Sequence, residues 1–173
     1  DYTDDELAEV TVRTTKTARQ RLSFTVRFTV NALQLHPDGR SLAYVTRGEG
    51  FLRRLDASEA FRLGDRIVDL VFSPDGARLA AVGVDGFVRV LDADSLTVLA
   101  VVGRHDLKGT IRPSMSAGGS RLATGVVGAS ARLWNLEGPG ETRRINVREC
   151  PDQATIVNDW GYHPVSFVGV SPN

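Results

Sequence analysis

An eight-residue segment recurs along the chain at a regular spacing. His36-Pro37-Asp38-Gly39-Arg40-Ser41-Leu42-Ala43 returns as Ser73-Pro74-Asp75-Gly76-Ala77-Arg78-Leu79-Ala80 and, in weaker form, as Ser116-Ala117-Gly118-Gly119-Ser120-Arg121-Leu122-Ala123. The copies begin 37 and then 43 residues apart. A period near this length is typical of a supersecondary unit that cannot bury its own faces and therefore stacks on copies of itself. The spacing predicts a repeat protein.

Each copy also contains several short apolar runs. In the second copy these are Ile67–Phe72, Arg78–Val84, Phe87–Leu91 and Leu96–Val102, separated by Ser-Pro-Asp-Gly and by Asp85-Gly86. Proline presets the first φ angle of a turn and glycine accepts a positive one, while Asp-Gly is a strong hairpin signal. Four short antiparallel strands that are apolar on both faces predict a propeller blade packed between neighbouring blades.

These residues resemble the WD40 repeat, whose third strand usually ends in Trp-Asp. The resemblance is carried by Ser73-Pro74-Asp75-Gly76, Val88-Arg89-Val90-Leu91-Asp92 and Ala131-Arg132-Leu133-Trp134-Asn135, and it covers roughly residues 30 to 137 and, more faintly, 160 to 173. The two residues at the end of this strand, the terminal pair, begin 19, 18 and 18 residues after the start of the turn motif. The pair is Leu-Asp in the first two copies and Trp-Asn in the third. A TolB-like propeller repeat also begins with Pro-Asp-Gly, but the Val-Arg-Val-Leu-Asp strand favours WD40.

In the WD40 family a histidine, the aspartate of the hairpin turn and the tryptophan of the third strand form a hydrogen-bonded network. No copy in this sequence has all three, because Asp85 belongs to a unit with Leu91 and Trp134 to a unit with Gly128 in its turn. The resemblance therefore implies blades held mainly by apolar packing.

The length predicts an incomplete propeller. Closed propellers use four to eight blades, whereas 173 residues supply about three complete units at this spacing. We expect an all-β, WD40-like segment of about three four-stranded antiparallel blades plus the start of another, not closed on its own. The expected divisions are lead-in strands or a divergent blade at 1–30, blades at 31–66, 67–103 and 104–150, and a loop with a further first strand at 151–173. On this interpretation the remaining blades of the same propeller belong to a longer protein, and the isolated chain associates or folds poorly because apolar faces stay uncovered.

Composition narrows the class of partner. Lys and Arg total 21 and Asp and Glu total 21, so no global field attracts nucleic acid or an anionic membrane. Only Lys16 and Lys108 are lysines, and with abundant Ala, Val and Gly this indicates a GC-rich bacterial source. The single Cys150 excludes an internal disulfide and favours a reducing, cytoplasmic compartment. We therefore expect neither a nucleic acid nor a membrane as partner.

A search for catalytic motifs in the sequence is negative. It finds no paired Cys motif, no His-Glu-x-x-His, no phosphate-binding Gly-rich loop and no Gly-x-Ser-x-Gly elbow. We expect no cofactor, no metal and no catalytic residue in this segment.

Three arginines recur on the third strand of the three units. Arg53, Arg89 and Arg132 are predicted to occupy equivalent positions and to stack at one radius around the propeller. Either their stems pack between blades, or their guanidinium groups form a positive ring for an acidic partner. Arg54 aligns with Val90 and Leu133, at a position expected to be buried, and needs a partner there.

The connections between blades carry the other candidate site. In a WD40 propeller they lie on the same face as the hairpins, a face that commonly binds peptides or proteins. They include charged and aromatic residues of the types enriched in interface hot spots, namely Arg104, His105, Asp106 and Lys108, then Trp160, Tyr162 and His163. The alternative is that Trp160 and Tyr162 anchor their loop to the blade.

The sequence predicts an interaction or ligand-sensing module that binds a protein or peptide within a larger, signalling protein. The resemblance supplies that context, because such repeats are often fused behind signalling modules in GC-rich bacteria. The alternative is an enzyme built on a propeller, such as a lactonase or a peptidase accessory domain, with acidic or histidine side chains clustered in its central channel.

Overall fold

The computed structural model describes residues 7–13, 17, 20–104, 111–126, 130–138 and 140–146, and every regular element in them is a β-strand. The strands are β1 (Leu7–Arg13), β2 (Gln20–Arg27), β3 (Val30–Leu35), β4 (Ser41–Thr46), β5 (Glu49–Arg54), β6 (Ala60–Gly64), β7 (Ile67–Phe72), β8 (Arg78–Gly83), β9 (Phe87–Asp92), β10 (Val98–Arg104), β11 (Ile111–Met115), β12 (Arg121–Val126), β13 (Ser130–Asn135) and β14 (Gly140–Asn146). The described residues contain no helix that could cross a membrane.

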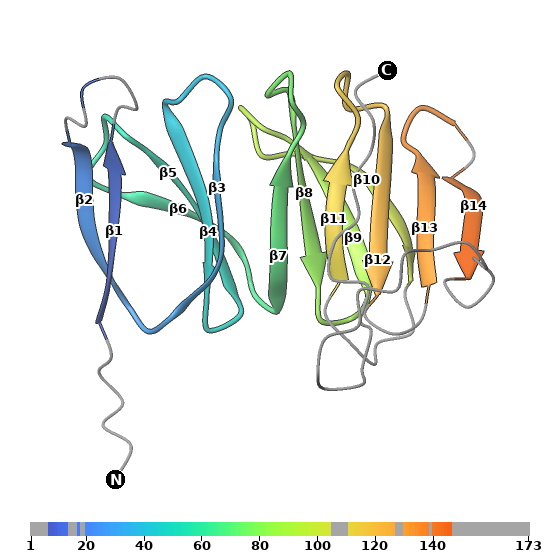
Figure 1. Cartoon of the computed structure of the whole chain (residues 1–173), viewed down its shortest axis with the longest axis horizontal. Helices are drawn as coiled ribbons and strands as arrows, with labels where there is room; N and C mark the ends of the chain where they lie inside the picture. The colour runs from blue at the N-terminus through green and yellow to red at the C-terminus, as the bar shows by residue number, and fades with distance from the viewer. Residues whose placement is uncertain are drawn as a thin grey trace, which may run out of the picture.

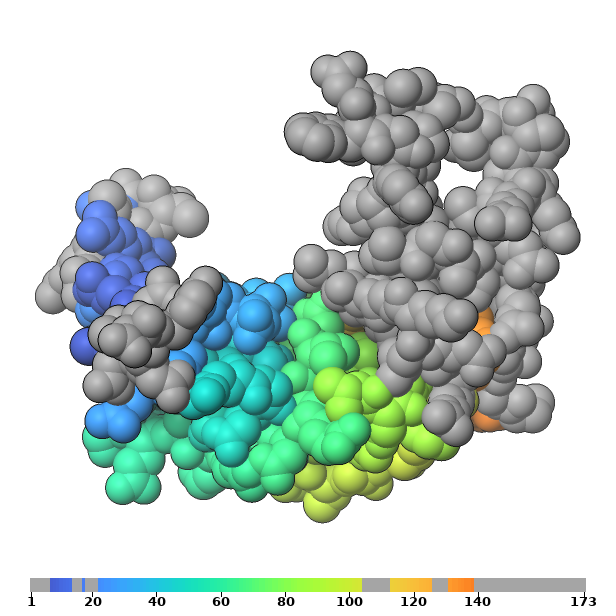
Figure 2. Space-filling model, turned by 90° about the horizontal axis from the view of Figure 1, so that it is seen from below, coloured from blue at the N-terminus to red at the C-terminus, as the bar shows by residue number. Residues whose placement is uncertain are grey.

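The strands form one two-stranded sheet and three four-stranded antiparallel sheets (Figure 1). β1 pairs with β2 in the short sheet, and β3–β6, β7–β10 and β11–β14 form the first, second and third sheets in chain order. Figure 2 shows the coloured sheets following one another along an arc. The predicted all-β class, with four-stranded antiparallel sheets that do not close, is confirmed.

The repeated motif forms the same turn in all three sheets. The amide N–H of Gly39 donates to the carbonyl of His36, that of Gly76 to Ser73, and that of Gly119 to Ser116, at 2.8 to 2.9 Å. All three glycines have φ between 65° and 78°, a conformation that other residues adopt only with strain. The turns lie along the upper edge of Figure 1, which we call the turn edge.

Two apolar cores lie between successive sheets. The core between the first and second sheets includes Val45, Leu70, Leu79 and Leu91, and the core between the second and third includes Val82, Val90, Leu122 and Trp134. Each side chain in this set is at most 6% exposed. Burying one such side chain contributes about 1.5 to 3 kcal/mol. The second sheet is apolar on both faces because each face packs against a neighbouring sheet.

The register of β5 in the first sheet differs by one residue from its counterparts. Leu79 pairs with Leu91 and Leu122 pairs with Trp134, yet Leu42, at the same repeat position, pairs with Arg53. The cause is the turn before β5. Thr46 pairs with Glu49, so only Arg47 and Gly48 connect the strands, and both have positive φ (48° and 77°), as a tight hairpin turn requires.

The same turn in the second sheet is longer. β8 ends at Gly83 and β9 begins at Phe87, with the Gly86 N–H donating to the Gly83 carbonyl. Asp85-Gly86 therefore lies in a three-residue connection, and the two-residue hairpin occurs at the less obvious Arg47-Gly48.

The predicted lead-in forms the short sheet. It packs on the first sheet through Phe24, whose ring centroid lies 5.7 Å from that of Tyr44, and through Thr46, whose hydroxyl donates to the Arg27 carbonyl. Two strands cannot cover a whole four-stranded face, and Leu33 and Leu35 on β3 are 47% and 49% exposed.

Candidate functional site

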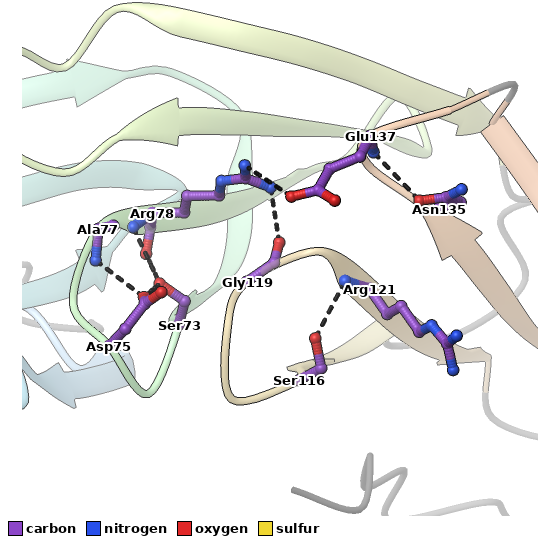
Figure 3. Close-up of polar contacts among 9 residues, drawn as sticks. All are labelled: Ser73, Asp75, Ala77, Arg78, Ser116, Gly119, Arg121, Asn135 and Glu137. Atoms are coloured by element: carbon purple, nitrogen blue, oxygen red, sulfur yellow. Dashed lines mark hydrogen bonds and ion pairs between the residues drawn. The ribbon is translucent and has the colours of Figure 1, made fainter. Parts of the chain in front are cut away.

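Two side chains tie the turn edge of one sheet to the turn edge of the next. His36 Nε2 donates to the carbonyl of Gly76 at 2.9 Å. Arg78 Nη1 donates to the carbonyl of Gly119 at 2.8 Å, as Figure 3 shows. Gly76 and Gly119 occupy the same repeat position. We call these two contacts the turn bonds. Both donors are largely covered, with side-chain exposures of 16% and 25%.

Glycine is needed at the acceptor positions for close approach as well as for φ. A Cβ atom on Gly76 would lie 2.6 Å from the His36 ring, and one on Gly119 would lie 3.2 Å from the stem of Arg78. His36 also meets the ring of Phe72 edge-on at 4.9 Å. The turn bonds were not predicted from the sequence. The signal that could have indicated them is a side chain with a hydrogen-bond donor close to each recurring glycine turn.

A pocket of about 400 Å³ opens at the turn edge between the first and second sheets. Its lining comes from the β3–β4 turn, the ends of β5 and β6, and the β9–β10 turn: His36, Asp38, Arg40, Ser41, Leu52, Arg54, Phe61 and Ala93 to Leu96. We call it the turn-edge pocket. It combines apolar side chains with charged groups of both signs.

One apolar side chain of the turn-edge pocket is largely exposed. Phe61 is 56% exposed, and its cross-strand partner Leu52 is buried in the core between the two sheets. Leu96, on the opposite wall, is half-buried and has φ of 59°, a strained conformation for a leucine. Such strain is often found at binding sites.

Asp38, one of the two acidic residues that line the turn-edge pocket, has hydrogen-bond partners within its own turn. The Asp38 carboxylate accepts the N–H of Arg40 at 2.7 Å and lies 2.7 Å from His36 Nδ1. The Arg40 N–H, together with His36, holds the pKa of Asp38 below its ordinary value. The carboxylate is therefore fully ionised at neutral pH and has its hydrogen-bond partners within its own turn.

Only two of the three recurring arginines share a position. Arg89 pairs with Ala81 and Arg132 with Thr124, but the residue paired with the equivalent Tyr44 is Phe51. The predicted equivalence of Arg53 is therefore wrong, because Arg53 lies opposite Leu42, two residues beyond the position that Arg89 and Arg132 share.

The three arginine side chains have different partners. Arg53 lies over the ring of Phe24, with its guanidinium carbon 4.4 Å from the centroid, and Arg132 is buried 5.8 Å from the Trp134 centroid. Arg89 forms an ion pair with Asp85 at 2.8 Å, which lowers the pKa of that carboxyl. Each arginine side chain therefore contacts a different part of the fold: the short sheet, the third sheet and the second sheet, respectively.

Arg54 is not buried, contrary to the sequence-based expectation. Its side chain is 60% exposed and lines the turn-edge pocket. The expectation failed because the register difference moves Arg54 from the aligned position of Val90 to a position at the end of the sheet, opposite Ser41.

The third sheet contains a buried polar contact. Trp134 Nε1 donates to the hydroxyl of Thr124 at 2.8 Å, and both residues are at most 2% exposed. A Cβ atom on Gly103 of the second sheet would lie 2.5 Å from the Trp134 ring. The tryptophan is thus held by one hydrogen bond within its sheet and by close contact with the next.

The predicted partner-binding loops cannot be placed. Of that set, Arg104 ends β10 with only its backbone described, while His105, Asp106, Lys108, Trp160, Tyr162 and His163 lie outside the described residues. Within the described ranges, no group of three or more His, Cys, Asp or Glu side chains could hold a metal ion.

Comparison with known proteins supports the fold but indicates no specific function. No protein-family model matches the sequence, and no curated protein matches it. Among solved structures, a chain of the "Crystal Structure of Mitotic Checkpoint Complex" is similar with a TM-score of 0.59 and 15% identity, over 68% of this chain and 36% of that chain. This chain therefore spans about a third of the similar structure's length. In all, 1116 chains match, so the arrangement is too common to select a function. The fold is that of a partial, WD40-like propeller.

Proposed function

We propose that this chain is a protein-interaction module that binds a peptide segment of a partner in the turn-edge pocket. The observation that carries the proposal is an exposed phenylalanine beside a pocket lined by both apolar and charged side chains. Peptide sites commonly combine an apolar floor with a few polar groups that fix orientation.

The architecture suits such a role. The pocket lies where two rigid sheets meet, and the turn bond from His36 to Gly76 fixes one turn against the next. A preorganised site loses little conformational entropy on binding. The similar solved chain belongs to a mitotic checkpoint complex, and a fold that occurs within a complex is consistent with this class of function.

Peptide selection tests the proposal. A random peptide library displayed on phage is selected on the immobilised chain, and the enriched peptides are measured against Phe61→Ala and against the control Leu35→Ala. Leu35 is exposed to a similar degree but lies on β3, outside the pocket lining. We expect Phe61→Ala to cost about 1 to 4 kcal/mol of binding and Leu35→Ala to cost less than about 0.5 kcal/mol.

Enriched peptides that bind Phe61→Ala and the unchanged chain equally would contradict the pocket as the site. The blade-connecting loops predicted from the sequence would then become the first alternative, with Trp160→Ala and Tyr162→Ala as the variants to measure.

A further inference from the structure

Arg54 occupies the position at which the other two sheets have a turn-capping oxygen. It pairs with Ser41 as Asp92 pairs with Arg78 and as Asn135 pairs with Arg121. Asp92 Oδ1 accepts the N–H groups of Asp94 and Ser95, and Asn135 Oδ1 accepts the N–H of Glu137. A guanidinium group has no acceptor, so Arg54 cannot cap its own turn in this way.

The guanidinium groups at the first-sheet wall of the pocket are available to a ligand. Arg54 forms a long ion pair with Asp56, with Nε 3.5 Å from Oδ1, and the two side chains are 60% and 78% exposed. A surface pair of this kind contributes little. Arg40 is exposed, and its side chain makes no ion pair or hydrogen bond with the described residues.

Among the described residues, neither carboxylate of the pocket lining forms an ion pair with Arg40 or Arg54, although the Arg40 N–H and, to a lesser extent, the charge of Arg40 lower the pKa of Asp38. Asp38 is engaged by the backbone of its own turn and by His36. The other pocket carboxylate, Asp94, belongs to the β9–β10 turn on the opposite wall. The first-sheet wall therefore presents two arginines next to Phe61 and Leu52, a combination that matches a carboxylate beside a large apolar side chain.

We propose that the turn-edge pocket selects acidic–apolar peptide segments, with the carboxylate bound by Arg54 and Arg40 and the neighbouring apolar side chain packed on Phe61 and Leu96. This inference rests on the proposed function, because it names the chemical class of the peptide that the pocket binds.

Defined peptides and a charge-matched control test it. The probes are fluorescein-labelled peptides with three repeats of Glu-Leu, Lys-Leu or Glu-Gly, titrated into the full chain and followed by fluorescence anisotropy. The variants are Arg54→Ala, Arg40→Ala and the control Arg121→Ala. Arg121 is an exposed arginine at the turn edge of the third sheet, outside the pocket lining, so its removal changes net charge by the same amount. Circular dichroism confirms that each variant keeps its strands.

We expect the Glu-Leu peptide to bind at least about tenfold more tightly than the other two, which corresponds to about 1.4 kcal/mol. Arg54→Ala should weaken that binding about tenfold, as loss of a hot-spot arginine does, whereas Arg121→Ala should change it less than about twofold. Raising the salt concentration should weaken the Glu-Leu complex of the unchanged chain more than that of Arg54→Ala.

Three results would overturn the inference. If the Glu-Leu and Lys-Leu peptides bind equally well and both lose binding in Phe61→Ala, the pocket still binds peptides. Its proposed preference for acidic peptides would then be refuted. Equal losses from Arg54→Ala and Arg121→Ala would show a general charge effect. Failure of all three peptides to bind would refute the acidic–apolar class, while the library selection would still decide the proposed function.

Discussion

The turn bond from Arg78 provides a matched test of how neighbouring sheets are held together. Arg78 and Arg121 occupy the same repeat position, but Arg78 Nη1 donates to the Gly119 carbonyl, whereas the Arg121 side chain is exposed and points away from that turn (Figure 3). Replacing each with methionine removes the charge and keeps much of the stem length. The repeat itself therefore supplies the control.

The expected magnitude follows from the contacts that each substitution removes. A hydrogen bond from a charged donor contributes about 1.5 to 3 kcal/mol, and the 25% exposure of Arg78 reduces this through competition with water. Its second contact, to Glu137 at 3.6 Å, is with a side chain that is 62% exposed and adds only a few tenths of a kcal/mol, roughly. We expect Arg78→Met to cost about 1 to 2 kcal/mol and Arg121→Met less than about 0.5 kcal/mol.

Urea unfolding of the full chain measures both values. Protein concentration is held constant, because any association would add to the apparent stability. An equal change in the free energy of unfolding for the two variants would refute the assignment of a stabilising role to the turn bond. A larger cost for Arg121→Met would show that the exposed arginine has a more important contact than Arg78.

Three further perturbations test other contacts. Gly103→Ala should destabilise the chain by about 1 to 3 kcal/mol, because its Cβ would overlap the Trp134 ring, and combining it with Trp134→Leu should recover part of the loss in a thermal melt. Thr124→Val should cost about 1 to 3 kcal/mol, because it removes the buried acceptor of the Trp134 N–H; Thr97→Val, at an exposed position, serves as the control, and equal costs would contradict the role of that bond. The Asp85 carboxyl has a pKa lowered first by its hydrogen bond from Arg89, so its contribution is present above its ordinary pKa of 3.8 and is lost as pH falls through the lower folded value. The stability difference between the unchanged chain and Asp85→Asn should therefore shrink on acidification below about pH 4, and a difference that grows there, measured by urea unfolding across pH, would reverse the sign of this linkage.

The sequence predicted the turns of the repeat better than its strand register. Pro-Asp-Gly motifs at Asp38-Gly39 and Asp75-Gly76 mark a local backbone requirement, positive φ at glycine, and that requirement can be recognised from the residues alone. The fold class followed because the period also fixes where strands begin and end.

The register of β5 depends on the two-residue turn before it, and the residues of that turn do not predict its conformation. Arg47 adopts positive φ in a two-residue turn, although arginine has no special preference for that conformation. This turn is one residue shorter, while the aligned terminal pair lies 19 and not 18 residues after the start of the motif, so Arg53 and Arg54 lie two positions beyond their aligned counterparts and both were misplaced. A two-residue shift keeps each side chain on the same face of the sheet but moves it along the strand, and it took Arg54 from an expected buried position to the exposed end of the sheet.

The turn-edge pocket was not predicted for a related reason. It joins Phe61 and Leu52 of the first sheet to Leu96 of the second, and the pairing of two turns across neighbouring sheets is a tertiary contact with no local signature. The site predicted from the sequence was instead chosen because charged and aromatic residues cluster in the connecting loops, and such clusters can be recognised without knowledge of the fold.

The acceptor in both turn bonds is a main-chain carbonyl, and this has a consequence for how such repeats diverge. The donors differ in type and in repeat position, since His36 begins its motif and Arg78 lies near the end of its own, yet both reach the glycine of the following turn. A carbonyl persists under every side-chain substitution, so the later repeat needs to retain only its glycine. Each repeat can then change its donor without a compensating change in its neighbour, and adjacent repeats can lose sequence similarity while keeping the same junction.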